Sequence, residues 1–296
     1  MLSFEQRSNG YIEDIDNYLA SKLPNIKTPP ANLHQAMHYS VMNGGKRIRP
    51  LLTFASAESL ELDPKILMPA AASIELLHCF SLVHDDLPCM DDDDLRRGRP
   101  STHKKFGEAT AVLAADALLS LSFEILASDL SFGATASNNA SLITLIARAT
   151  GSKGITGGQQ LDLYAEGRII SQSELEHIYR QKTGKLLRAC ILAPNCFVNI
   201  GLEKMSALEK YIDSIGLAFQ IKDDIIEAES STEIIGKSEK SDIRQRKATF
   251  PIIFGLDESK KRMIELLELA QNEISVFGER AHALEYMAQS IINREF

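Results

Sequence analysis

The sequence lacks the features of several large classes of protein, and each absence narrows its function. Its four cysteines show no CxxC spacing and sit in apolar helical contexts, which predicts a reduced, cytoplasmic protein. No basic stripe accompanies the net charge of −8, so nucleic acid is not an expected partner. A zinc protease is not indicated either, because the residues between His34 and His38 lack the glutamate of an HExxH motif.

Export signals and long apolar runs are also missing. The stretch MLSFEQRSNGYIEDIDNYL is polar and has no apolar signal core. The longest apolar stretch, Ile66–Val83, is interrupted by Pro69, Glu75 and His78, which indicates a buried helix rather than a membrane span. We therefore expect no integral membrane segment.

Strand signals are nearly absent, and helical periodicity dominates instead. Apolar residues recur at three- and four-residue spacing along most of the chain. The expected helices are Ile12–Leu23, Leu33–Met42, Ile66–His84, Ala109–Leu130, Glu174–Val198, Lys204–Glu229, Lys260–Gln271 and Arg280–Ile292. No Pro- or Ser-rich linker divides the chain. The prediction is an all-α protein, a single domain over residues 1–296 that forms one large bundle of about ten helices around a central catalytic cavity.

One stretch, SLVHDDLPCMDDDDLRRGRP (81–100), concentrates charge of both signs. Carboxylates ~6 Å apart repel by roughly 3 kcal/mol per pair at an effective dielectric of ~20, although a solvated acidic loop would feel much less. In a cleft these aspartates would need cations, and clustered hard oxygen ligands suit Mg²⁺. The adjoining arginines then indicate a polyphosphate, since Arg binds phosphate oxygens bidentately.

A second acidic motif, FQIKDDIIE, favours the metal interpretation over the solvated loop. Asp223 and Glu227 are four residues apart in an apolar helix, so their carboxylates share a face. Burying such aspartates without partners would be very costly. The chain also contains cationic side chains, which could supply the positive charge that these aspartates would need nearby.

Three more segments carry groups suited to anions or to a cavity. NGGKRIRP (43–50) combines approachable glycine backbone with three cations before a helix, although an ordinary turn with solvated arginines has the same pattern. His78 lies about two turns before Asp85, on the same helical face. In GGQQLD, Gln159 and Asp162 share a face. Gly184 interrupts the helix of KTGK (182–185), which predicts a local kink or a close approach of another segment there.

Together these motifs resemble the trans-isoprenyl diphosphate synthases, most closely the bacterial farnesyl diphosphate synthases. The matching motifs, in chain order, are GGKRIRP, HDDLPCMDDDDLRRGRP, GGQQLDL, KTGKLL, AFQIKDDIIE, and GK followed by KATFP. The resemblance implies a cytoplasmic, homodimeric prenyltransferase. Its reaction would condense isopentenyl diphosphate with dimethylallyl or geranyl diphosphate to give farnesyl diphosphate, by ionisation, condensation and proton loss.

The resemblance also implies a role for individual residues. It implies about three Mg²⁺ per site, with Mn²⁺ as a substitute, bound by Asp85, Asp86, Asp91, Asp223, Asp224 and Glu227. The allylic diphosphate would be bound by Arg96, Lys182, Thr183, Gln220 and Lys237. Isopentenyl diphosphate would occupy a metal-free site made by Gly45, Lys46, Arg49, His78 and Arg97. The catalytic set would be Asp85, Asp223, Lys182, Thr183 and Gln220.

Product length is implied by the residues just before the first acidic motif. The bulky Phe80 and the small Ser81 fit a fifteen-carbon product, with simple core packing as the other explanation for Phe80. Three residues depart from the family pattern: Glu227 replaces an aspartate, Ser241 replaces a glycine, and Lys222 precedes Asp223. We expect these to tune activity rather than abolish it.

Other functions remain open at this point. A geranyl or geranylgeranyl diphosphate synthase would share these motifs. A terpene cyclase handles a single diphosphate, so it would not need GGKRIRP with His78 and Arg97. A non-catalytic subunit of a heteromeric synthase would be expected to lose one acidic motif, and both are present.

Overall fold

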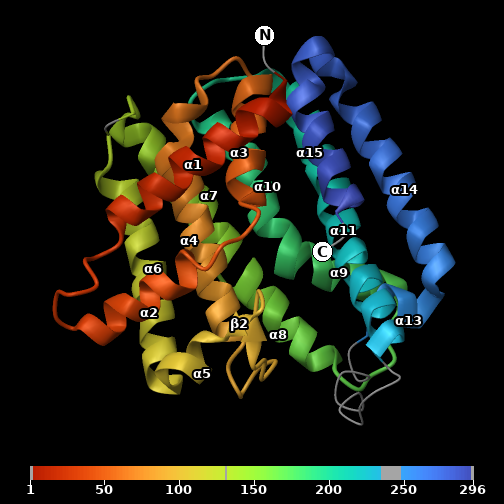
Figure 1. Ribbon diagram of the computed structural model, residues 1–296. Helices are drawn as coiled ribbons and strands as arrows, with labels where there is room; N and C mark the ends of the chain where they lie inside the picture. Colours follow the sequence, from red (N-terminus) through yellow and green to blue (C-terminus); the bar gives the residue numbers. More distant parts are fainter. Residues whose placement is uncertain (1–2, 131, 235–247, 295–296) are drawn as a thin grey trace. The chain divides into compact units, whose positions relative to one another are not determined.

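The computed structural model describes residues 3–130, 132–234 and 248–294, with side chains except at 230–234. Its contacts group into two compact units, Met1–Thr144 and Leu145–Phe296 (Figure 1). In both units helix follows helix, and the only sheet in the described part is a ribbon of two short strands. The all-α class is therefore confirmed. A single domain over residues 1–296 stays a prediction.

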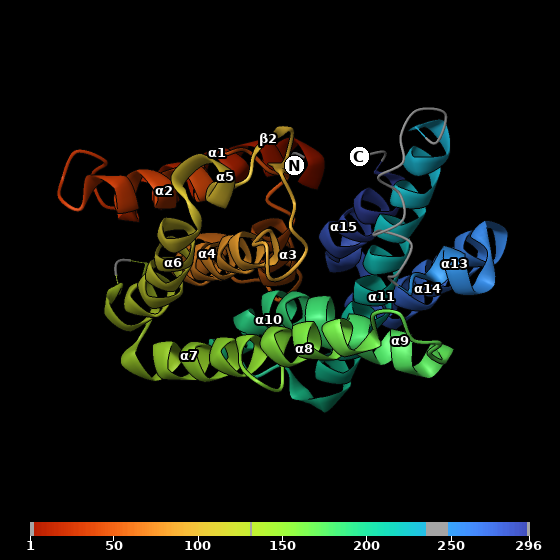
Figure 2. The same ribbon diagram turned by 90° about the horizontal axis from the view of Figure 1, so that it is seen from below.

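The first unit is built around one strongly apolar helix. Its elements are α1 (Phe4–Lys22), α2 (Ala31–Val41), α3 (Ile48–Ser59), η1 (Pro64–Leu67), α4 (Met68–Asp85), β1 (Leu95–Arg96), β2 (Arg99–Pro100), α5 (Thr102–Phe106), α6 (Glu108–Ser128) and the start of α7 (Ala136–Thr150). α4 is buried on nearly all sides, as its sequence requires, because a helix without a polar face must lie inside the protein. It contacts α1, α2, α3 and α6, and Figure 2 shows α1 and α2 along one side of it.

Local signals explain where several elements begin and end. α1 starts at Phe4, before the predicted Ile12, because Ser3 and Gln6 form a capping box: each side chain accepts a hydrogen bond from the other's backbone N–H. α4 ends at Asp85, and Pro88 follows in the turn. The backbone N–H of Asp91 donates to the carbonyl of Asp85 at 2.8 Å. The chain therefore turns back after the first acidic pair.

The ribbon β1–β2 follows directly and was not predicted. Arg96 pairs with Arg99 across a two-residue turn, in which Arg97 and Gly98 both have positive φ (53° and 74°). Turns with two left-handed residues match the twist of a hairpin. The ribbon therefore fixes the backbone of two neighbouring arginines, Arg96 and Arg97.

The second unit is organised around a long helix. Its elements are α8 (Ile155–Ala165), α9 (Gln172–Tyr179), the π-helix η2 (Arg180–Gly184), α10 (Lys185–Leu192), η3 (Ala193–Cys196), α11 (Gly201–Ile234), α13 (Phe250–Phe254), α14 (Leu256–Glu273), η4 (Ile274–Ala281) and α15 (His282–Asn293). α11 packs most extensively on α14 and also contacts α10 and α15. The predicted helix Glu174–Val198 is present as α9, η2, α10 and η3 in series.

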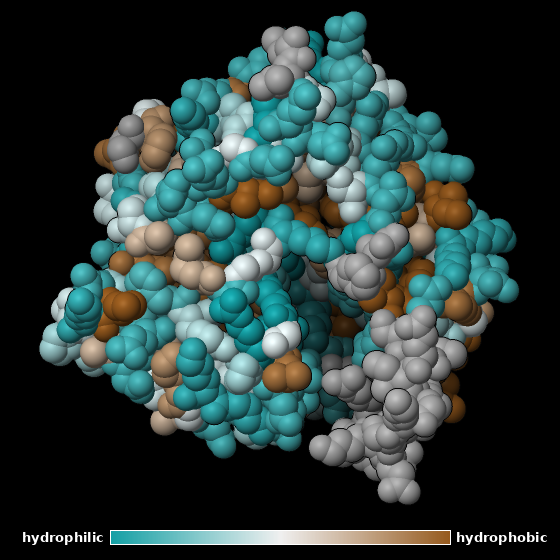
Figure 3. Space-filling model, viewed as in Figure 1, coloured by the Kyte–Doolittle hydropathy of each residue, from teal (hydrophilic) through white to brown (hydrophobic). Residues whose placement is uncertain are grey.

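Two helices are long and apolar enough to cross a membrane by length and composition alone. In Pro64–Asp85 the apolar window is 72% buried inside the protein, and in Glu108–Ser128 it is 39% buried. Core helices meet the same criteria, so the first is explained by its packing. On the face shown in Figure 3, apolar side chains form separate patches among polar ones. No clear membrane-spanning helix is present in the described residues.

Candidate active site

The six aspartates of the first acidic motif lie in three different environments. Asp92 and Asp94 are exposed and face Lys104, whose Nζ lies 2.7 Å from an Asp94 oxygen. Asp85 and Asp91 are half-buried, and the backbone hydrogen bond across the turn brings their main chains together. These two carboxylates, predicted as metal ligands, are therefore the pair that the local fold groups at the end of α4.

Asp86 is buried and bound to an arginine. Its carboxylate accepts from Nε of Arg96 at 3.0 Å and from Nη2 at shorter range, and Nη2 also reaches Asp93 at 3.3 Å. Burial raises the pKa of Asp86, against the opposing effect of Arg96. Asp86 thus holds Arg96, the residue predicted to bind the allylic diphosphate, and in this conformation it supports the site rather than offering a metal its oxygens.

The predicted anion loop NGGKRIRP lies against the ribbon. The Arg97 guanidinium donates to the Gly44 carbonyl and covers Gly45, where an added Cβ would lie 2.6 Å from Arg97 Nη1. Gly45 has φ +131°, a backbone conformation that favours glycine. The pKa of His78 is well below its ordinary value because of burial and then the positive charges of Arg49 and Arg97. The ribbon therefore brings Arg97 to the glycine turn that was predicted to bind an anion.

Arg47, one of the three cations of the predicted anion loop, points into the protein instead of toward an anion. It is 2% exposed, and its Nε and Nη1 lie 2.7 Å from Asp16 and 2.8 Å from Glu75, while Nη2 donates to the Val41 carbonyl at 2.9 Å. Its left-handed φ of 48° turns its side chain away from the path of its neighbours. The signal that could have found it was Glu75, a lone acid in an apolar helix.

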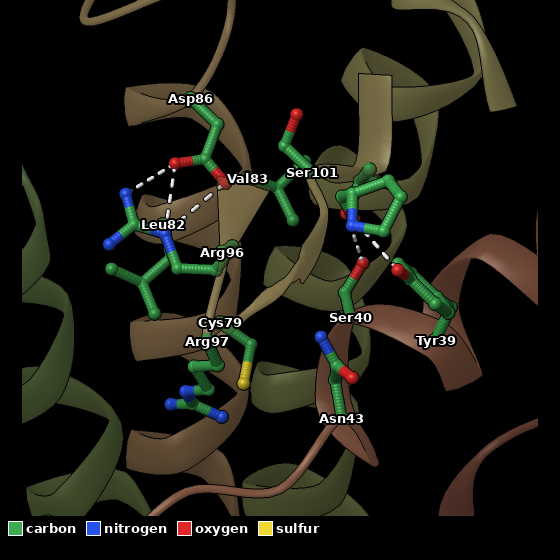
Figure 4. Close-up of a pocket in the computed structure, with 12 residues that line it drawn as sticks. Tyr39, Ser40, Asn43, Cys79, Leu82, Val83, Asp86, Arg96, Arg97 and Ser101 are labelled. Atoms are coloured by element: carbon green, nitrogen blue, oxygen red, sulfur yellow. Dashed lines mark hydrogen bonds and ion pairs between the residues drawn. The ribbon is translucent and has the colours of Figure 1, made fainter. Parts of the chain in front are cut away.

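A small pocket lies within the first unit beside these groups. It is lined by Tyr39, Ser40, Asn43, Cys79, Leu82, Val83, Asp86, Arg96, Arg97, Pro100, Ser101 and Thr102. Figure 4 shows the ion pair between Asp86 and Arg96 at one end, with Arg97 and Cys79 next to each other. Burial raises the pKa of the Cys79 thiol to about 12, which leaves it uncharged at neutral pH. The pocket connects the Asp86–Arg96 pair to the Arg97 loop.

In the second unit, Lys182 and Thr183 lie on the π-helix η2. Lys182 Nζ pairs with Asp162 at 2.7 Å, and the Thr183 hydroxyl donates to Gln220 Oε1 at 2.8 Å. α8 packs closely there, since a Cβ on Gly158 would lie 2.2 Å from the backbone nitrogen of Lys182. The kink predicted at Gly184 is a π-turn, a geometry that is frequent at functional sites.

The second acidic motif places Asp224 on a different face of α11 from Asp223 and Glu227. The Asp223 side chain is 42% exposed and pairs with Arg294 Nη2 at 2.6 Å, while Glu227 is exposed. Asp224 is buried, and its oxygens accept from Tyr179, the backbone N–H of Phe250, and Gln220. Burial raises the pKa of Asp224 to about 7. Asp224 is thus held by donors from three helices, and its role as a metal ligand stays a prediction.

Other predicted residues are placed as follows. Phe80 is half-buried, packs against the cluster of Val83, Leu87, Ala111 and Ala115, and makes an edge contact with the His84 ring at 4.7 Å. The Ser81 hydroxyl bonds to the His78 carbonyl at 2.9 Å. Lys237 and Ser241 lie outside the described residues. Their roles stay predictions.

The carboxylates fit magnesium only in combination with a substrate. Within the described residues, no group of three or more His, Cys, Asp or Glu side chains could hold a metal ion by itself. Mg²⁺ commonly binds proteins through one or two carboxylates, keeps water, and takes further oxygens from a substrate phosphate. Asp85 with Asp91, and separately Asp223, match that requirement.

Comparison with known proteins identifies the family. The family model described as polyprenyl synthetase matches residues 30–287. The chain belongs to the polyprenyl synthetase family. This polyprenyl synthetase is 38% identical over 294 residues to a farnesyl diphosphate synthase of Geobacillus stearothermophilus, covering 99% of both chains.

Its relatives differ in the product that their names give. A geranylgeranyl diphosphate synthase of Cyanophora paradoxa is 38% identical over 283 residues, covering 95% of this chain and 93% of the relative. Among solved structures, a putative farnesyl diphosphate synthase of Marinomonas sp. MED121 has a TM-score of 0.83 and 37% identity, covering 99% of this polyprenyl synthetase and 100% of that chain. The expected family is therefore confirmed.

Proposed function

We propose that the chain condenses isopentenyl diphosphate with an allylic diphosphate, dimethylallyl or geranyl, to form farnesyl diphosphate and release diphosphate. One observation carries the proposal: Arg97 lies against the Gly44–Gly45 turn of the GGKRIRP loop, in the same unit that carries the first acidic motif. An enzyme acting on one diphosphate would need the acidic motifs and their metal, but not this second cationic site. Full-length relatives named farnesyl diphosphate synthase support the same reaction.

The metal-dependent part of the site is assigned to the accessible carboxylates. Asp85, Asp91, Asp223 and Glu227 would bind about three Mg²⁺ together with the allylic diphosphate, with Mn²⁺ as a substitute. Bound there, the metal supplies positive charge that stabilises the diphosphate as it leaves. Arg96, Lys182 and, outside the described residues, Lys237 would add fixed charge around the same diphosphate.

The organic cation left by ionisation requires oxygen dipoles rather than a base. Thr183 and Gln220 are hydrogen-bonded to each other, so their oxygens have fixed directions. The π-turn at Lys182 also carries backbone carbonyls that differ in direction from those of a regular helix. Attack by the double bond of isopentenyl diphosphate and loss of a proton to the departed diphosphate complete the reaction, without a nucleophilic side chain.

The second substrate would be bound by charge and backbone alone. Lys46, Arg49, His78 and Arg97 would bind its diphosphate, and Gly45 would allow close approach of the backbone. His78, being uncharged at neutral pH, would donate one N–H to a phosphate oxygen. A metal is not required for this site, because several cations already meet there.

Product length is assigned to the residues just before the first acidic motif. Phe80, with the small Ser81 beside it, would form the floor that stops growth at fifteen carbons. The packing of Phe80 on Val83, Leu87, Ala111 and Ala115 supports a fixed ring at this position. A geranylgeranyl product is the second candidate, favoured by the relative from Cyanophora paradoxa.

The protein would act as a homodimer in the cytoplasm. On α6, Val112 and Leu113 are 37% and 57% exposed although the helix is strongly apolar, and a second copy would cover them. Sedimentation of the wild type and of Leu113→Glu tests this. A dimer that the substitution dissociates is expected, and a wild-type monomer would contradict it.

The reaction is tested by incubating the purified protein with Mg²⁺, isopentenyl diphosphate and each allylic starter, and identifying the products by mass spectrometry. Farnesyl diphosphate is expected, and chelation of the metal should abolish its formation. A geranylgeranyl product would overturn the role of Phe80 but not the reaction. No elongation with any starter would indicate a non-catalytic subunit, and a cyclic hydrocarbon would indicate a terpene cyclase.

A further inference from the structure

The π-helix Arg180–Gly184 needs support from its surroundings. A π-turn is rarer and less favourable than an α-turn, so it persists where other contacts hold it. It carries Lys182 and Thr183, and Tyr179 immediately precedes it. The contacts of Tyr179 therefore bear directly on how this segment is held.

Tyr179 is bonded to the second acidic motif at its buried aspartate. The Tyr179 hydroxyl donates to Asp224 Oδ2 at 2.5 Å, and the backbone N–H of Phe250 donates to the same oxygen at 3.0 Å. Tyr179 and Asp224 are each 6% exposed, and Phe250 is 2% exposed. One carboxylate oxygen thus joins α9, α11 and α13 in a place that water barely reaches.

The other oxygen of Asp224 sets the direction of an amide. It accepts from Gln220 Nε2 at 3.5 Å, one helical turn earlier on α11. With its N–H₂ group directed at a carboxylate, Gln220 is left with Oε1 on the side of Thr183, and it accepts the Thr183 hydroxyl there at 2.8 Å. Because the Thr183 hydroxyl proton is donated to Gln220, the Thr183 oxygen can interact with another group only through its lone pairs.

The neighbouring aspartate has a different position. Residues next to each other on a helix are about 100° apart around its axis, so Asp223 and Asp224 face different directions. Asp223 is 42% exposed and pairs with Arg294, whereas Asp224 is enclosed by donors from three helices. The two carboxylates therefore do not offer one metal the same surface.

We propose that Asp224 and Tyr179 are positioning residues that hold Gln220 and Thr183 with their oxygens directed at the allylic cation. This inference rests on the proposed function and deepens it. It gives Tyr179 a role in the reaction and changes the role of Asp224 from the one expected from the motif.

The test compares four variants in steady-state kinetics over a range of Mg²⁺ concentrations. Tyr179→Phe and Asp224→Asn should each lower kcat by about tenfold or more, as expected for loss of one or two buried hydrogen bonds. Their half-saturating Mg²⁺ concentration and the KM for isopentenyl diphosphate should stay at wild-type values. The double variant should be no slower than Asp224→Asn, because both act through one network. Asp223→Asn should instead raise the Mg²⁺ requirement.

Tyr211→Phe is the matched control. Tyr211 is buried on the same helix α11, and its hydroxyl donates to the Leu284 carbonyl at 2.7 Å, so this variant also loses one buried tyrosine hydrogen bond. It should lower the melting temperature about as much as Tyr179→Phe does, with kcat unchanged. A Tyr179→Phe variant with wild-type kcat would show that Tyr179 only packs, and would overturn the proposal.

A binding measurement decides the role of Asp224 without turnover. Calorimetric titration of Mg²⁺ into protein with inorganic diphosphate should give the wild-type affinity for Asp224→Asn and a weaker one for Asp223→Asn. Equal weakening in both would make Asp224 a metal ligand and overturn the proposal. If Asp224→Asn does not fold, the kinetics of Tyr179→Phe decide alone. A wild type that binds Mg²⁺ and diphosphate but elongates nothing would refute the proposed function instead.

Discussion

Arg47→Met provides the sharpest test of how the anion loop is held. The substitution removes a guanidinium that pairs with Glu75, a carboxylate whose side chain is 2% exposed, and leaves that charge buried without its cation. Removing one partner of a buried ion pair destabilises proteins by about 3–5 kcal/mol. The second partner, Asp16, is 38% exposed and can be hydrated, so its loss adds about 0–1 kcal/mol. We expect the buried pair with Glu75 to dominate.

A second substitution separates charge from packing. Replacing a buried ion pair by apolar residues of similar volume is often neutral or stabilising, so Arg47→Met with Glu75→Leu should recover most of the loss. Lys210→Met is the control, because its pair with Glu273 is 61% exposed on the lysine side and should contribute less than about 1 kcal/mol. Urea unfolding followed by circular dichroism measures each difference.

Arg47→Met should also change the kinetics of the enzyme in a specific way. Arg47 joins the loop to α1, to the end of α2 and to α4, so its loss should release Lys46 and Arg49 from their places. The KM for isopentenyl diphosphate should rise, while the KM for the allylic substrate stays nearly constant. An Arg47→Met protein within 1 kcal/mol of the wild type, or a double variant as unstable as the single one, would refute the reasoning.

Three further predictions follow from the site. Gly158→Ala would place a Cβ 2.2 Å from the backbone nitrogen of Lys182, so it should lower the free energy of unfolding by about 1–3 kcal/mol and also lower kcat. Gly216→Ala is the control and should be tolerated, because the nearest atom to its added Cβ lies at 3.5 Å. Equal effects of the two substitutions would contradict the prediction. Phe80→Ala should lengthen the products seen by mass spectrometry, and unchanged products would limit Phe80 to packing. The pKa of His78 is lowered in the folded protein, so as pH falls through the ordinary value of 6.5 the unfolded chain binds the proton first, and the folded state loses stability below that pH. His78→Gln should reduce this loss. An unchanged pH profile of stability in the variant would count against a lowered pKa.

Local patterns predicted the helices well but not the surroundings of the buried acids. The apolar run of α4 and the turn after Pro88 depend on neighbouring residues, so both could be read from the sequence. The environment of Asp224 depends on Tyr179, 45 positions earlier, and on Phe250, 26 positions later. The spacing of residues within a motif does not predict which distant residues will contact it.

The same limit applies to the first acidic motif. Asp86 looks equivalent to Asp85 in the sequence, yet one is enclosed with Arg96 and the other is half-buried. The two-residue strands were also unpredictable, because so short a run has no periodicity. Their turn could have been suspected from Arg97-Gly98, since glycine favours positive φ.

The ribbon β1–β2 has a consequence for how the two substrates bind. Arg96 and Arg97 are adjacent on it, and the proposed function assigns one to each diphosphate. With those roles, the substrate that binds first would stiffen the backbone that the second one needs, and would lower the entropy lost in the second step. Such coupling must be equal in both directions, so each substrate should tighten the binding of the other by the same factor.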